Sequence, residues 1–316
     1  MKLSVIIPNY NGLHFLKSFL PSVVEQDFTE KEIIIVDNGS HDSSVEWIKN
    51  THKSVDVIEL DKNFGFSKAV NEGIKRSKGE YILLLNNDVQ LSQGFFSGLY
   101  LFIRHKKNAF SVQGKMLQYN ERTKIDDVGD NLTLLGWTKK RGEGKPHNRY
   151  DKPVEVFSTC SGATIYRKSV FDEIGLFDEG FFAYLEDVDI GYRSRIFGYE
   201  NWYCPDAVCF HVGSGTSGSR YNRFKVLLSV RNNVYLAYKN MPLIQLIVNV
   251  PFLTIGFFIK WVFFSFKGFG KDYLSGFVEG LKTLNKIEKI PFDKKNFVHY
   301  LKIEWALLKN TFTFFF

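Results

Sequence analysis

The sequence predicts an α/β fold: a mostly parallel sheet flanked by helices, followed by a helical C-terminal region. Within the first 90 residues, four short apolar runs alternate with helical patterns. Strands joined by helices in this way pair in parallel through right-handed crossovers. A long apolar segment at residues 243–266 predicts the C-terminal helical region. The chain has 316 residues, of which 44% are hydrophobic, so it can bury a large core and still carry an appendage.

The clearest strand is the apolar run at residues 81–85, which ends on Asn86, Asn87 and Asp88. An uninterrupted apolar run suits a strand that is buried on both faces. Its end would hold Asp88 at the sheet edge where open α/β folds bind ligands. A plain turn after a core strand is the alternative, because all three residue types favour turns.

The other elements of the first half follow the same pattern. We expect strands at residues 3–7, 32–36 and 55–60, and helices at 14–26 (interrupted at Pro21), 43–50 and 67–77. Polar loops follow the strands at residues 9–12, 37–40, 63–66 and 86–88. Because the strands are expected to be parallel, these four loops should open on one edge of the sheet.

The second half is less regular. We expect helices at residues 95–105, 168–174 and about 186–198, strands at 110–119, 124–135, 159–166, 201–204 and 207–210, and a mobile, basic loop at 136–154. A Gly/Ser-rich stretch at residues 212–218 has the composition of a flexible loop that could close over a substrate.

Three carboxylates begin the helix near residue 186. Acidic residues at a helix N-terminus have a plain explanation, because they interact favourably with the helix dipole. Asp189 shares a face with Glu186 and can pair with Arg193 four residues later. Asp187 has no such local partner, which makes it the better candidate for chemistry.

A single histidine, His211, ends the last expected strand, just before the Gly/Ser-rich stretch. A lone histidine is more often an ordinary polar residue than a ligand. Its position beside a loop that could close over a substrate favours a metal-binding role.

Composition narrows the function classes. The net charge is +7, but the basic residues are scattered and no nucleic-acid motif accompanies them, so nucleic acid is not an expected partner. Three cysteines without paired spacing indicate neither a disulfide framework nor a zinc site, and a reducing cytoplasm fits best. The first apolar run is too short for a signal peptide. The glycine pattern of a dinucleotide-binding turn and the phosphate-binding loop of nucleotide triphosphatases are both missing.

The ordered set of motifs resembles glycosyltransferase family 2 over residues 3–240. The matching segments are Val5-Ile6-Ile7-Pro8-Asn9-Tyr10-Asn11, Val36-Asp37, Asn63-Phe64-Gly65 with Asn71, Asn86-Asn87-Asp88, Glu186-Asp187-Val188-Asp189 and His211. The resemblance implies a Rossmann-like GT-A fold, inverting transfer from a nucleotide-diphosphate sugar, and a divalent metal, Mg²⁺ or Mn²⁺. The motifs look most similar to the rhamnosyltransferase-like branch.

The resemblance also implies roles for individual residues. Pro8, Asn9 and Tyr10 would line the base pocket, Asp37 would hold the pyrimidine or ribose, and Asn63, Gly65 and Asn87 would border the donor. Asp88 matches the last acid of the family's Asp-x-Asp motif and would bind the metal together with His211, and Asp187 matches the general base. One departure lowers the charge of the metal site: the first acid of Asp-x-Asp is Asn86 here.

We therefore expect a glycosyltransferase domain at residues 1–240, with a nucleotide-binding half (1–90) and an acceptor or catalytic half (91–240). Its product would be a cell-surface glycan, with rhamnose as one candidate sugar. A nucleotidyltransferase is one alternative, although residues 9–12 lack the Lys or Arg that would hold a triphosphate. A catalytically inactive, membrane-bound scaffold that binds nucleotide sugar is the other, because the Asp-x-Asp motif is degraded.

Residues 241–316 are expected to form a helical, membrane-associated region. The segment at 243–266 is long enough to span a bilayer, but Gln245, Asn249, Gly256 and Lys260 form a less apolar stripe and Pro251 should kink or break the helix. Lysines lie on both sides of this segment, so a single crossing would leave a lysine-rich tail outside the cell, against the positive-inside tendency. We expect peripheral or monotopic attachment at the cytoplasmic face of the cell membrane, close to a glycan or polyprenyl-diphosphate-linked acceptor. A spanning or re-entrant helix and a buried core or dimer helix are the alternatives.

Overall fold

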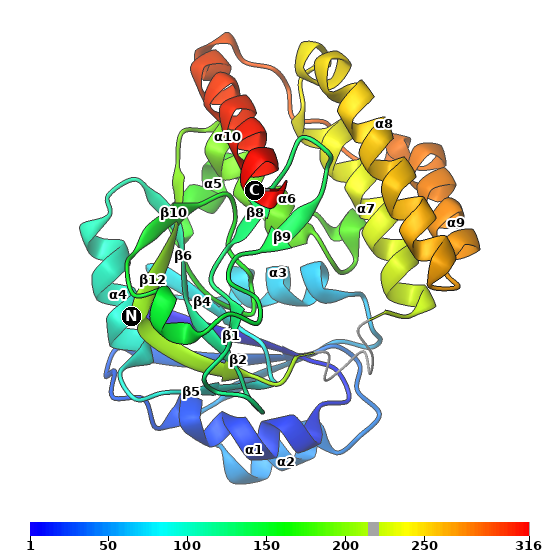
Figure 1. Ribbon diagram of the computed structural model, residues 1–316. Coiled ribbons are helices and arrows are strands. Elements are labelled where there is room, and N and C mark those ends of the chain that lie inside the picture. The colour runs from blue at the N-terminus through cyan, green and yellow to red at the C-terminus, as the bar shows by residue number, and fades with distance from the viewer. Residues whose placement is uncertain (214–220, 316) are drawn as a thin grey trace.

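A ten-stranded sheet forms the centre of the molecule (Figure 1). The computed structural model describes residues 1–213 and 221–315. The expected flexible loop at 212–218 therefore lies mostly outside the described residues. The strands are β1 (Leu3–Asn9), β2 (Lys31–Asp37), β3 (Asp56–Glu59), β4 (Tyr81–Leu85), β5 (Val89–Leu91), β6 (Ala109–Gln118), β7 (Ile125–Asp127), β10 (Val154–Val156), β11 (Ala163–Arg167) and β12 (Glu200–His211), with β8 (Asp130–Leu132) and β9 (Thr138–Lys140) in a separate pair.

The main path of the sheet has the order β10-β12-β6-β11-β4-β1-β2-β3, and β5 and β7 are attached to β12 and β6. Among the described strands of this path, only β10 and β11 are antiparallel to the others. The α/β class with a mostly parallel sheet flanked by helices is confirmed. Because β1, β2 and β4 are parallel neighbours, the loops after them open on the same edge, as expected.

Strand β4 is apolar throughout and β1 and β2 largely so, because both faces of these strands are covered, whereas the edge strand β3 has exposed acidic ends. The helices are α1 (Leu13–Val24), α2 (Ser44–Thr51), α3 (Phe66–Arg76), α4 (Phe95–His105), α5 (Phe171–Ile174), α6 (Glu186–Ile196), α7 (Arg223–Asn240), α8 (Leu243–Phe266), α9 (Gly270–Lys282) and α10 (Phe297–Phe315). On β1, Val5 and Ile7 pack in one cluster with residues of α1 and α4, whereas Ile6 packs with residues of α3. This alternation is what a strand between two helical layers requires.

Several boundaries in the second half differ from the predictions. The expected strand at 124–135 is two short strands, because Gly129 between them has φ +106°. The expected pieces at 201–204 and 207–210 form one strand, β12, with an irregularity between Tyr203 and Val208. The basic segment at 136–154 contains strand β9 and a short 3₁₀ turn (His147–Arg149). Tertiary pairing therefore organises a segment whose polar composition favoured a loop.

Proline does not interrupt the two helices in which an interruption was expected. Helix α1 runs through Pro21 and helix α8 runs through Pro251. A proline inside a helix removes one backbone hydrogen bond, and here tertiary packing compensates for that loss. Leu20 and Val23 next to Pro21 are buried in the sheet core, and Asn249 and Leu253 on either side of Pro251 are buried as well.

The C-terminal helices form a second layer beside the sheet, with α8, α9 and α10 on the upper side in Figure 1. The less apolar stripe of α8 faces the protein: Gln245 and Asn249 are buried, and both donate hydrogen bonds to Glu304 on α10. Gly256 lies so close to the carbonyl of Leu135 that a Cβ would collide with it. The opposite, apolar side of α8 is exposed.

Candidate functional site

Asn9 joins the C-terminal ends of three parallel strands. Its Nδ2 donates a hydrogen bond to Oδ2 of Asp37 (2.8 Å), and its Oδ1 accepts one from Nδ2 of Asn87 (2.8 Å). All three side chains are buried. A Cβ on Gly12 would collide with the Asn87 and Asn9 side chains, so the turn after β1 requires glycine. Pro8 and Tyr10, which flank Asn9, are half-buried at the same edge.

Asp37 is fixed from a second side by the turn that follows β2. Its two carboxylate oxygens accept hydrogen bonds from the backbone N–H of Ser40 (2.9 Å) and from the Ser40 hydroxyl (2.7 Å). Hydrogen bonds of this kind are the usual turn chemistry of an aspartate. Asp37 also belongs to the Asn9 network, because one of its oxygens accepts the bond from Asn9.

Asn38 holds the third loop against the second, and sequence reasoning did not single it out. Its Nδ2 donates to Oδ1 of Asn63 (3.1 Å) and to the carbonyl of Gly65 (3.0 Å). Its Oδ1 accepts from the N–H of Phe64 (3.0 Å). The residues expected to border a donor, Asn63 and Gly65, are thus linked to Asp37 through its sequence neighbour.

Asp88 and His211 are brought together by an antiparallel pairing. Val89, at the start of β5, lies opposite His211, at the end of β12. Oδ1 of Asp88 is 3.4 Å from Nε2 of His211. The other ring nitrogen, Nδ1, is 2.8 Å from Oδ2 of Asp126. The sequence predicted the first partner and missed Asp126, because a single aspartate in an irregular segment carries no signal of its own.

The carboxylates govern the charge of His211. Burial would lower the pKa of this ring, but the hydrogen bonds to Asp126 and Asp88 outweigh burial and raise the pKa to about 9. A metal would have to displace this proton. Among residues 1–213 and 221–315, no three His, Cys, Asp or Glu side chains are grouped to hold a metal ion. Asp88 and His211 are therefore the candidate pair of metal donors, and Asp126 holds the second ring nitrogen of His211.

The segment between β6 and β10 adds a cluster of charges that the sequence did not reveal. Nζ of Lys140 on β9 lies 3.3 Å from Oδ2 of Asp126 and 3.8 Å from Oδ2 of Asp127. Burial and neighbouring carboxylates raise the pKa of Asp127 and, further, that of Asp130. Lys140, expected in a mobile basic loop, is instead fixed among these acids.

Asp187 lies in the first turn of α6 and is half-buried. Its Oδ1 accepts a hydrogen bond from the N–H of Val188 (2.8 Å). Burial, together with the charge of Asp127, raises the pKa of Asp187 to about 6. Burial and Asp187 raise the pKa of the adjacent Glu186 to about 8. A carboxyl group with a pKa near neutrality is suited to proton transfer.

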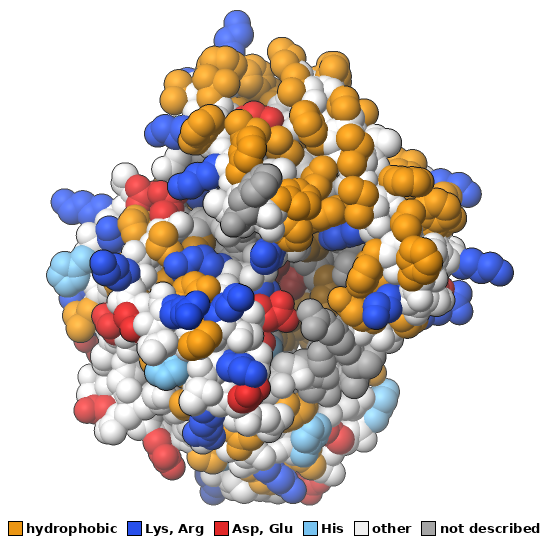
Figure 2. Space-filling view, viewed as in Figure 1, with side chains coloured by type: hydrophobic (Ala, Val, Ile, Leu, Met, Phe, Trp, Pro, Cys, Tyr) orange, Lys and Arg blue, Asp and Glu red, His pale blue; other side chains and the backbone are white. Residues whose placement is uncertain are grey.

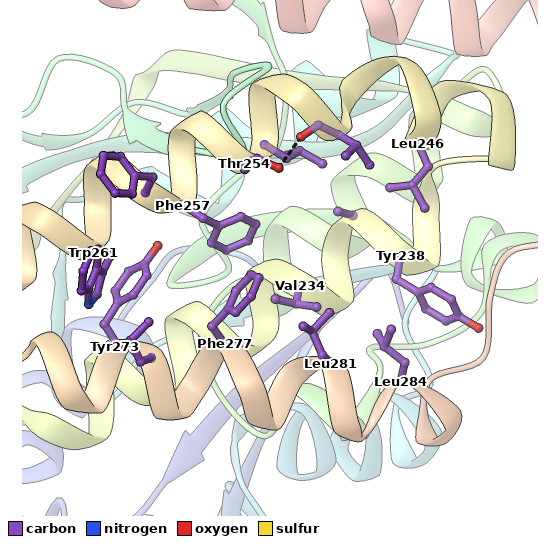
Figure 3. Close-up of a pocket in the computed structure, with 15 residues that line it drawn as sticks. Val234, Tyr238, Leu246, Thr254, Phe257, Trp261, Tyr273, Phe277, Leu281 and Leu284 are labelled. Atoms are coloured by element: carbon purple, nitrogen blue, oxygen red, sulfur yellow. Dashed lines mark hydrogen bonds between the residues drawn. The ribbon is translucent and has the colours of Figure 1, made fainter.

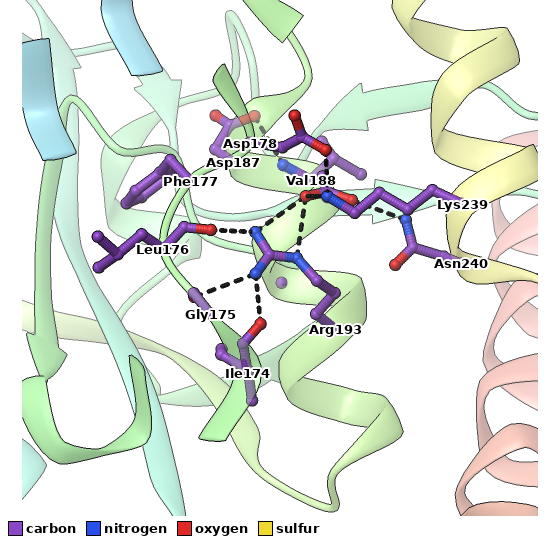
Figure 4. A network of polar contacts seen from close by, with 12 residues as sticks. Ile174, Gly175, Leu176, Phe177, Asp178, Asp187, Val188, Arg193, Lys239 and Asn240 are labelled. Carbon is purple, nitrogen blue, oxygen red and sulfur yellow. Dashed lines mark hydrogen bonds and ion pairs between the residues drawn. The ribbon is translucent and has the colours of Figure 1, made fainter. Parts of the chain in front are cut away.

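Asp189 has a different environment, a buried ion-pair network (Figure 4). Its carboxylate pairs with Arg193 (2.9 Å) and with Lys239 on α7 (3.2 Å) and accepts a bond from Asn240 (2.8 Å). Burial would raise the pKa of Asp189, but Arg193 and Lys239 outweigh it and lower that pKa. The predicted Asp189–Arg193 pair is confirmed, and this paired carboxylate differs from Asp187, which the described ion pairs do not include.

A strained turn leads into α6. Phe182, Tyr184 and Leu185 all have φ between +63° and +71°, a region that non-glycine residues rarely adopt. The carbonyl of Phe182 accepts from the N–H of Phe66 (2.6 Å), and a Cβ on Gly65 would collide with it. The turn therefore connects the predicted donor edge at Gly65 with the acids of α6.

Comparison with known proteins adds the family. The chain is 28% identical over 229 residues to the poly-β-1,6-N-acetyl-D-glucosamine synthase of Staphylococcus epidermidis, and 25% identical over 227 residues to that of Staphylococcus aureus. Each alignment covers 70% of this chain and 52% of the relative, so the chain spans about half the length of these relatives.

Solved structures share the fold. A crystal structure of GalNAc-T7 with UDP, GalNAc and Mn²⁺ matches 75% of this chain and 47% of that chain (TM-score 0.60, 19% identity). S. aureus TarS 1–349 in complex with UDP-GlcNAc matches 80% of this chain and 70% of that chain (TM-score 0.54, 20% identity). The fold class is thus GT-A-like. Residues 4–175 match the sequence model of glycosyl transferase family 2. The matched part includes Asp88 and the strands and polar loops of the Asn9 network. With more than half of its length in that match, the chain belongs to glycosyl transferase family 2.

Proposed function

We propose that this protein transfers a sugar from a nucleotide-diphosphate sugar to a lipid-linked or polysaccharide acceptor, with inversion at the anomeric carbon. The observation that supports the proposal is a set of polar groups at the carboxyl ends of the strands: the Asn87–Asn9–Asp37 network, the Asp88–His211 pair, and the turn that leads to Asp187, which is joined to this edge by the hydrogen bond from the Phe66 N–H to the Phe182 carbonyl. The carboxyl edge of a parallel sheet is where α/β folds bind nucleotides.

The donor would lie along this edge. Asp37 and Asn9, with Pro8 and Tyr10 beside them, offer a carboxylate, an amide and an aromatic face, which suit a ribose and a base. Asn63, Gly65 and Asn87 would border the remainder of the donor. The Staphylococcus relatives are named for N-acetylglucosamine, so UDP-GlcNAc is the first donor to test, and a nucleotide-linked rhamnose is the second.

A divalent metal, Mg²⁺ or Mn²⁺, would be held by Asp88 and His211 together with the diphosphate of the donor. When bound, it would neutralise the negative charge that develops on the leaving diphosphate. The two side chains supply one carboxylate oxygen and one ring nitrogen within 3.4 Å of one another. Asn86 in place of an acid lowers the charge of the site, which predicts weak metal binding in the absence of the nucleotide.

Asp187 would act as the general base. It would accept the proton of the acceptor hydroxyl while that oxygen bonds to the anomeric carbon and the nucleoside diphosphate leaves. Of the three acids that begin α6, Glu186 is fully covered and Asp189 is committed to Arg193 and Lys239. Of these three acids, only Asp187 is partly exposed, so it is the one that an acceptor would reach.

The acceptor would be presented at a membrane. Apolar side chains gather on the upper part of the surface, over the C-terminal helices (Figure 2). The exposed apolar residues of these helices include Ile244, Phe266 and Trp305, with exposed fractions of 79%, 88% and 67%. Helix α8 is long and apolar enough to cross a bilayer by length and composition. Because the polar stripe of α8 faces the protein, we propose that residues 241–316 attach the chain to the cytoplasmic face of the membrane in a peripheral or monotopic way. We also propose that residues 1–90 bind the donor and that residues 91–240 bind the acceptor.

A panel of nucleotide sugars tests the proposal. The purified chain is incubated with UDP-GlcNAc, UDP-GalNAc, dTDP-rhamnose or GDP-mannose, with Mn²⁺, Mg²⁺ or a chelator, and the released nucleoside diphosphate is measured with and without a membrane extract as acceptor source. Metal-dependent release from one donor is expected. Binding of a nucleotide sugar without release under any condition would favour the inactive scaffold. Release of inorganic diphosphate from a nucleotide triphosphate and a sugar phosphate would favour the nucleotidyltransferase.

A further inference from the structure

An apolar groove lies between α8 and α9, with α7 as its floor (Figure 3). Its volume is about 480 Å³, within the range of small-molecule sites. Phe257 of α8 and Phe277 of α9 point toward one another across it, with ring centroids 5.0 Å apart. Nearly every other lining side chain is aliphatic or aromatic, so the groove offers hydrophobic contact and almost no hydrogen bonding.

A second pocket of about 440 Å³, which is more polar, lies beside the groove. Tyr273, in the first part of α9, lines both. Two lysines line the second pocket, Lys225 of α7 and Lys260 of α8, and none of the described residues that line it is acidic. The apolar groove and the pocket with the two lysines are therefore neighbours that share one wall.

Lys260 is placed to receive an anion. Its ammonium lies over the ring of Trp137, 5.8 Å from the ring centroid, and within the described residues it forms no ion pair with a carboxylate. Burial alone lowers the pKa of Lys260 to about 8. Burial and the charge of nearby Lys140 lower the pKa of Lys225 as well. Positive charges gathered in a half-buried pocket are stabilised by a bound anion.

The second pocket also borders the proposed active site. Tyr184 and Leu185 line it, and both belong to the strained turn that immediately precedes Glu186 and Asp187. The second pocket therefore lies against the turn that leads to the proposed base.

We propose that this groove and the pocket beside it bind a long-chain lipid phosphate or diphosphate, with the hydrocarbon chain between α8 and α9 and the phosphate at Lys260 and Lys225. The apolar lining suits the hydrocarbon chain, the two lysines suit the phosphate, and the turn that leads to Asp187 lies at the pocket that holds the lysines. The groove adjoins the exposed apolar side of α8, so the chain could enter from a membrane without crossing water. The inference rests on the proposed function, because it assigns the acceptor's carrier.

Binding of farnesyl diphosphate to the purified full chain tests the assignment, with farnesol and inorganic diphosphate as the two halves of the ligand. Calorimetry should show farnesyl diphosphate binding at least about tenfold more tightly than either half, because only the intact molecule satisfies both pockets. Leu274→Glu places a charge in the groove and should weaken binding about tenfold or more. Val278→Glu is its matched control, since Val278 is on the same helix and equally exposed (45%) but does not line the groove.

The cationic pocket is tested in the same way. Lys260→Gln should weaken farnesyl diphosphate by about tenfold and leave farnesol unchanged, whereas Lys271→Gln, outside the pocket, should change neither. The assignment is overturned if farnesol binds as tightly as farnesyl diphosphate, if inorganic diphosphate does, or if Val278→Glu is as damaging as Leu274→Glu.

Donor binding separates this inference from the proposed function. UDP-sugar binding should be the same in all four variants, because none of these residues lies near Asn9 or Asp37 in the described contacts. Normal UDP-sugar binding with no farnesyl diphosphate binding would reject the lipid site alone. Lipid phosphate binding without binding or release of any nucleotide sugar would reject the transferase proposal and leave the lipid site standing.

Discussion

The side-chain amide of Asn232 lies 2.7 Å from the carbonyl oxygen of Tyr184, and thereby ties helix α7 to the strained turn before α6. The same Nδ2 is 2.9 Å from the carbonyl of Phe181 and 2.8 Å from that of Ala183. Arg231 orients the amide by donating to its Oδ1 (3.0 Å). The two N–H groups of one buried amide are therefore shared among three carbonyls of a segment whose backbone is otherwise unfavourable.

We predict that Asn232→Ala lowers turnover more than it lowers stability. Without the amide, the turn can relax toward ordinary backbone angles, and Asp187, which follows it, loses its position. We expect turnover to fall about tenfold to a hundredfold, with unchanged affinity for the nucleotide sugar. Asn233→Ala is the matched control, since the neighbouring amide binds the carbonyl of Gly136 instead. Equal losses of turnover in both variants would contradict a positioning role for Asn232.

Asp187→Asn should retain donor binding and lose turnover by about 10²- to 10⁴-fold, the usual contribution of a general base. The base must be deprotonated, and burial raises the pKa of Asp187 to about 6. Turnover of the unmodified chain should therefore decline as the pH falls through about 6. A pH–rate profile measures this, and a profile that stays flat between pH 5 and 7 (about one unit on either side of that pKa) would remove Asp187 from the role.

Asp189→Asn should act on stability. Asp189 is fully buried, and the substitution leaves Arg193 and Lys239 buried without its charge, at a cost of about 3–5 kcal/mol in the free energy of unfolding. Urea unfolding measures the loss. Glu59→Gln, in the exposed Lys49–Glu59 pair, should cost at most about 1 kcal/mol. If Asp189→Asn instead abolished turnover in a chain of normal stability, the roles given to Asp187 and Asp189 would be reversed.

The contribution of Asp189 to the stability of the fold changes with pH in a definite direction. Because the pKa of Asp189 is lowered in the folded chain, its ion pairs stabilise the fold fully above the unfolded pKa of about 3.9. That stability is lost as the pH falls below this value and through the folded pKa. The difference in unfolding free energy between the unmodified chain and Asp189→Asn should shrink in acid.

Asp88→Ala should remove metal-dependent transfer, with a fall of about 100-fold or more, because charge stabilisation of the leaving diphosphate is worth several kcal/mol. The fold should persist, since Asp88 follows the end of β4 and none of the described hydrogen bonds of the sheet depends on its side chain. Release of nucleoside diphosphate is the assay, and the exposed Asp61→Ala is the control. Undiminished activity in excess chelator would remove the metal from the mechanism.

Ile255→Glu should weaken binding to lipid vesicles by about tenfold or more, because it places a charge on the apolar side of α8 that we propose to meet the membrane. Leu101→Glu on α4 is the matched control, since its exposed fraction, 51%, equals that of Ile255 within one per cent. Protease added outside intact cells should not cut the chain after residue 267. Cleavage there would establish a spanning helix, and equal vesicle binding by all three chains would argue against attachment through α8.

The order of the elements was predictable because it follows from local patterns of apolar and polar residues in the sequence. Four apolar runs, each followed by a polar loop, predicted parallel strands with loops on one edge, and Asn9, Asp37 and Asn87 do lie together there. The three-residue and four-residue spacings of a helix likewise separated Asp187 from Asp189. These inferences need only the periodicity of strands and helices, which acts over a few residues.

Only the tertiary structure decided which side chains from distant segments become partners. Asp126 against His211, Lys239 against Asp189, and Asn232 against Tyr184 are separated by 48 to 85 residues, and no spacing along the chain encodes them. The same holds for the groove between α8 and α9. The sequence showed an apolar helix with a polar stripe, but which side would meet protein depended on Glu304 and Leu135, because burial is a property of the packed chain.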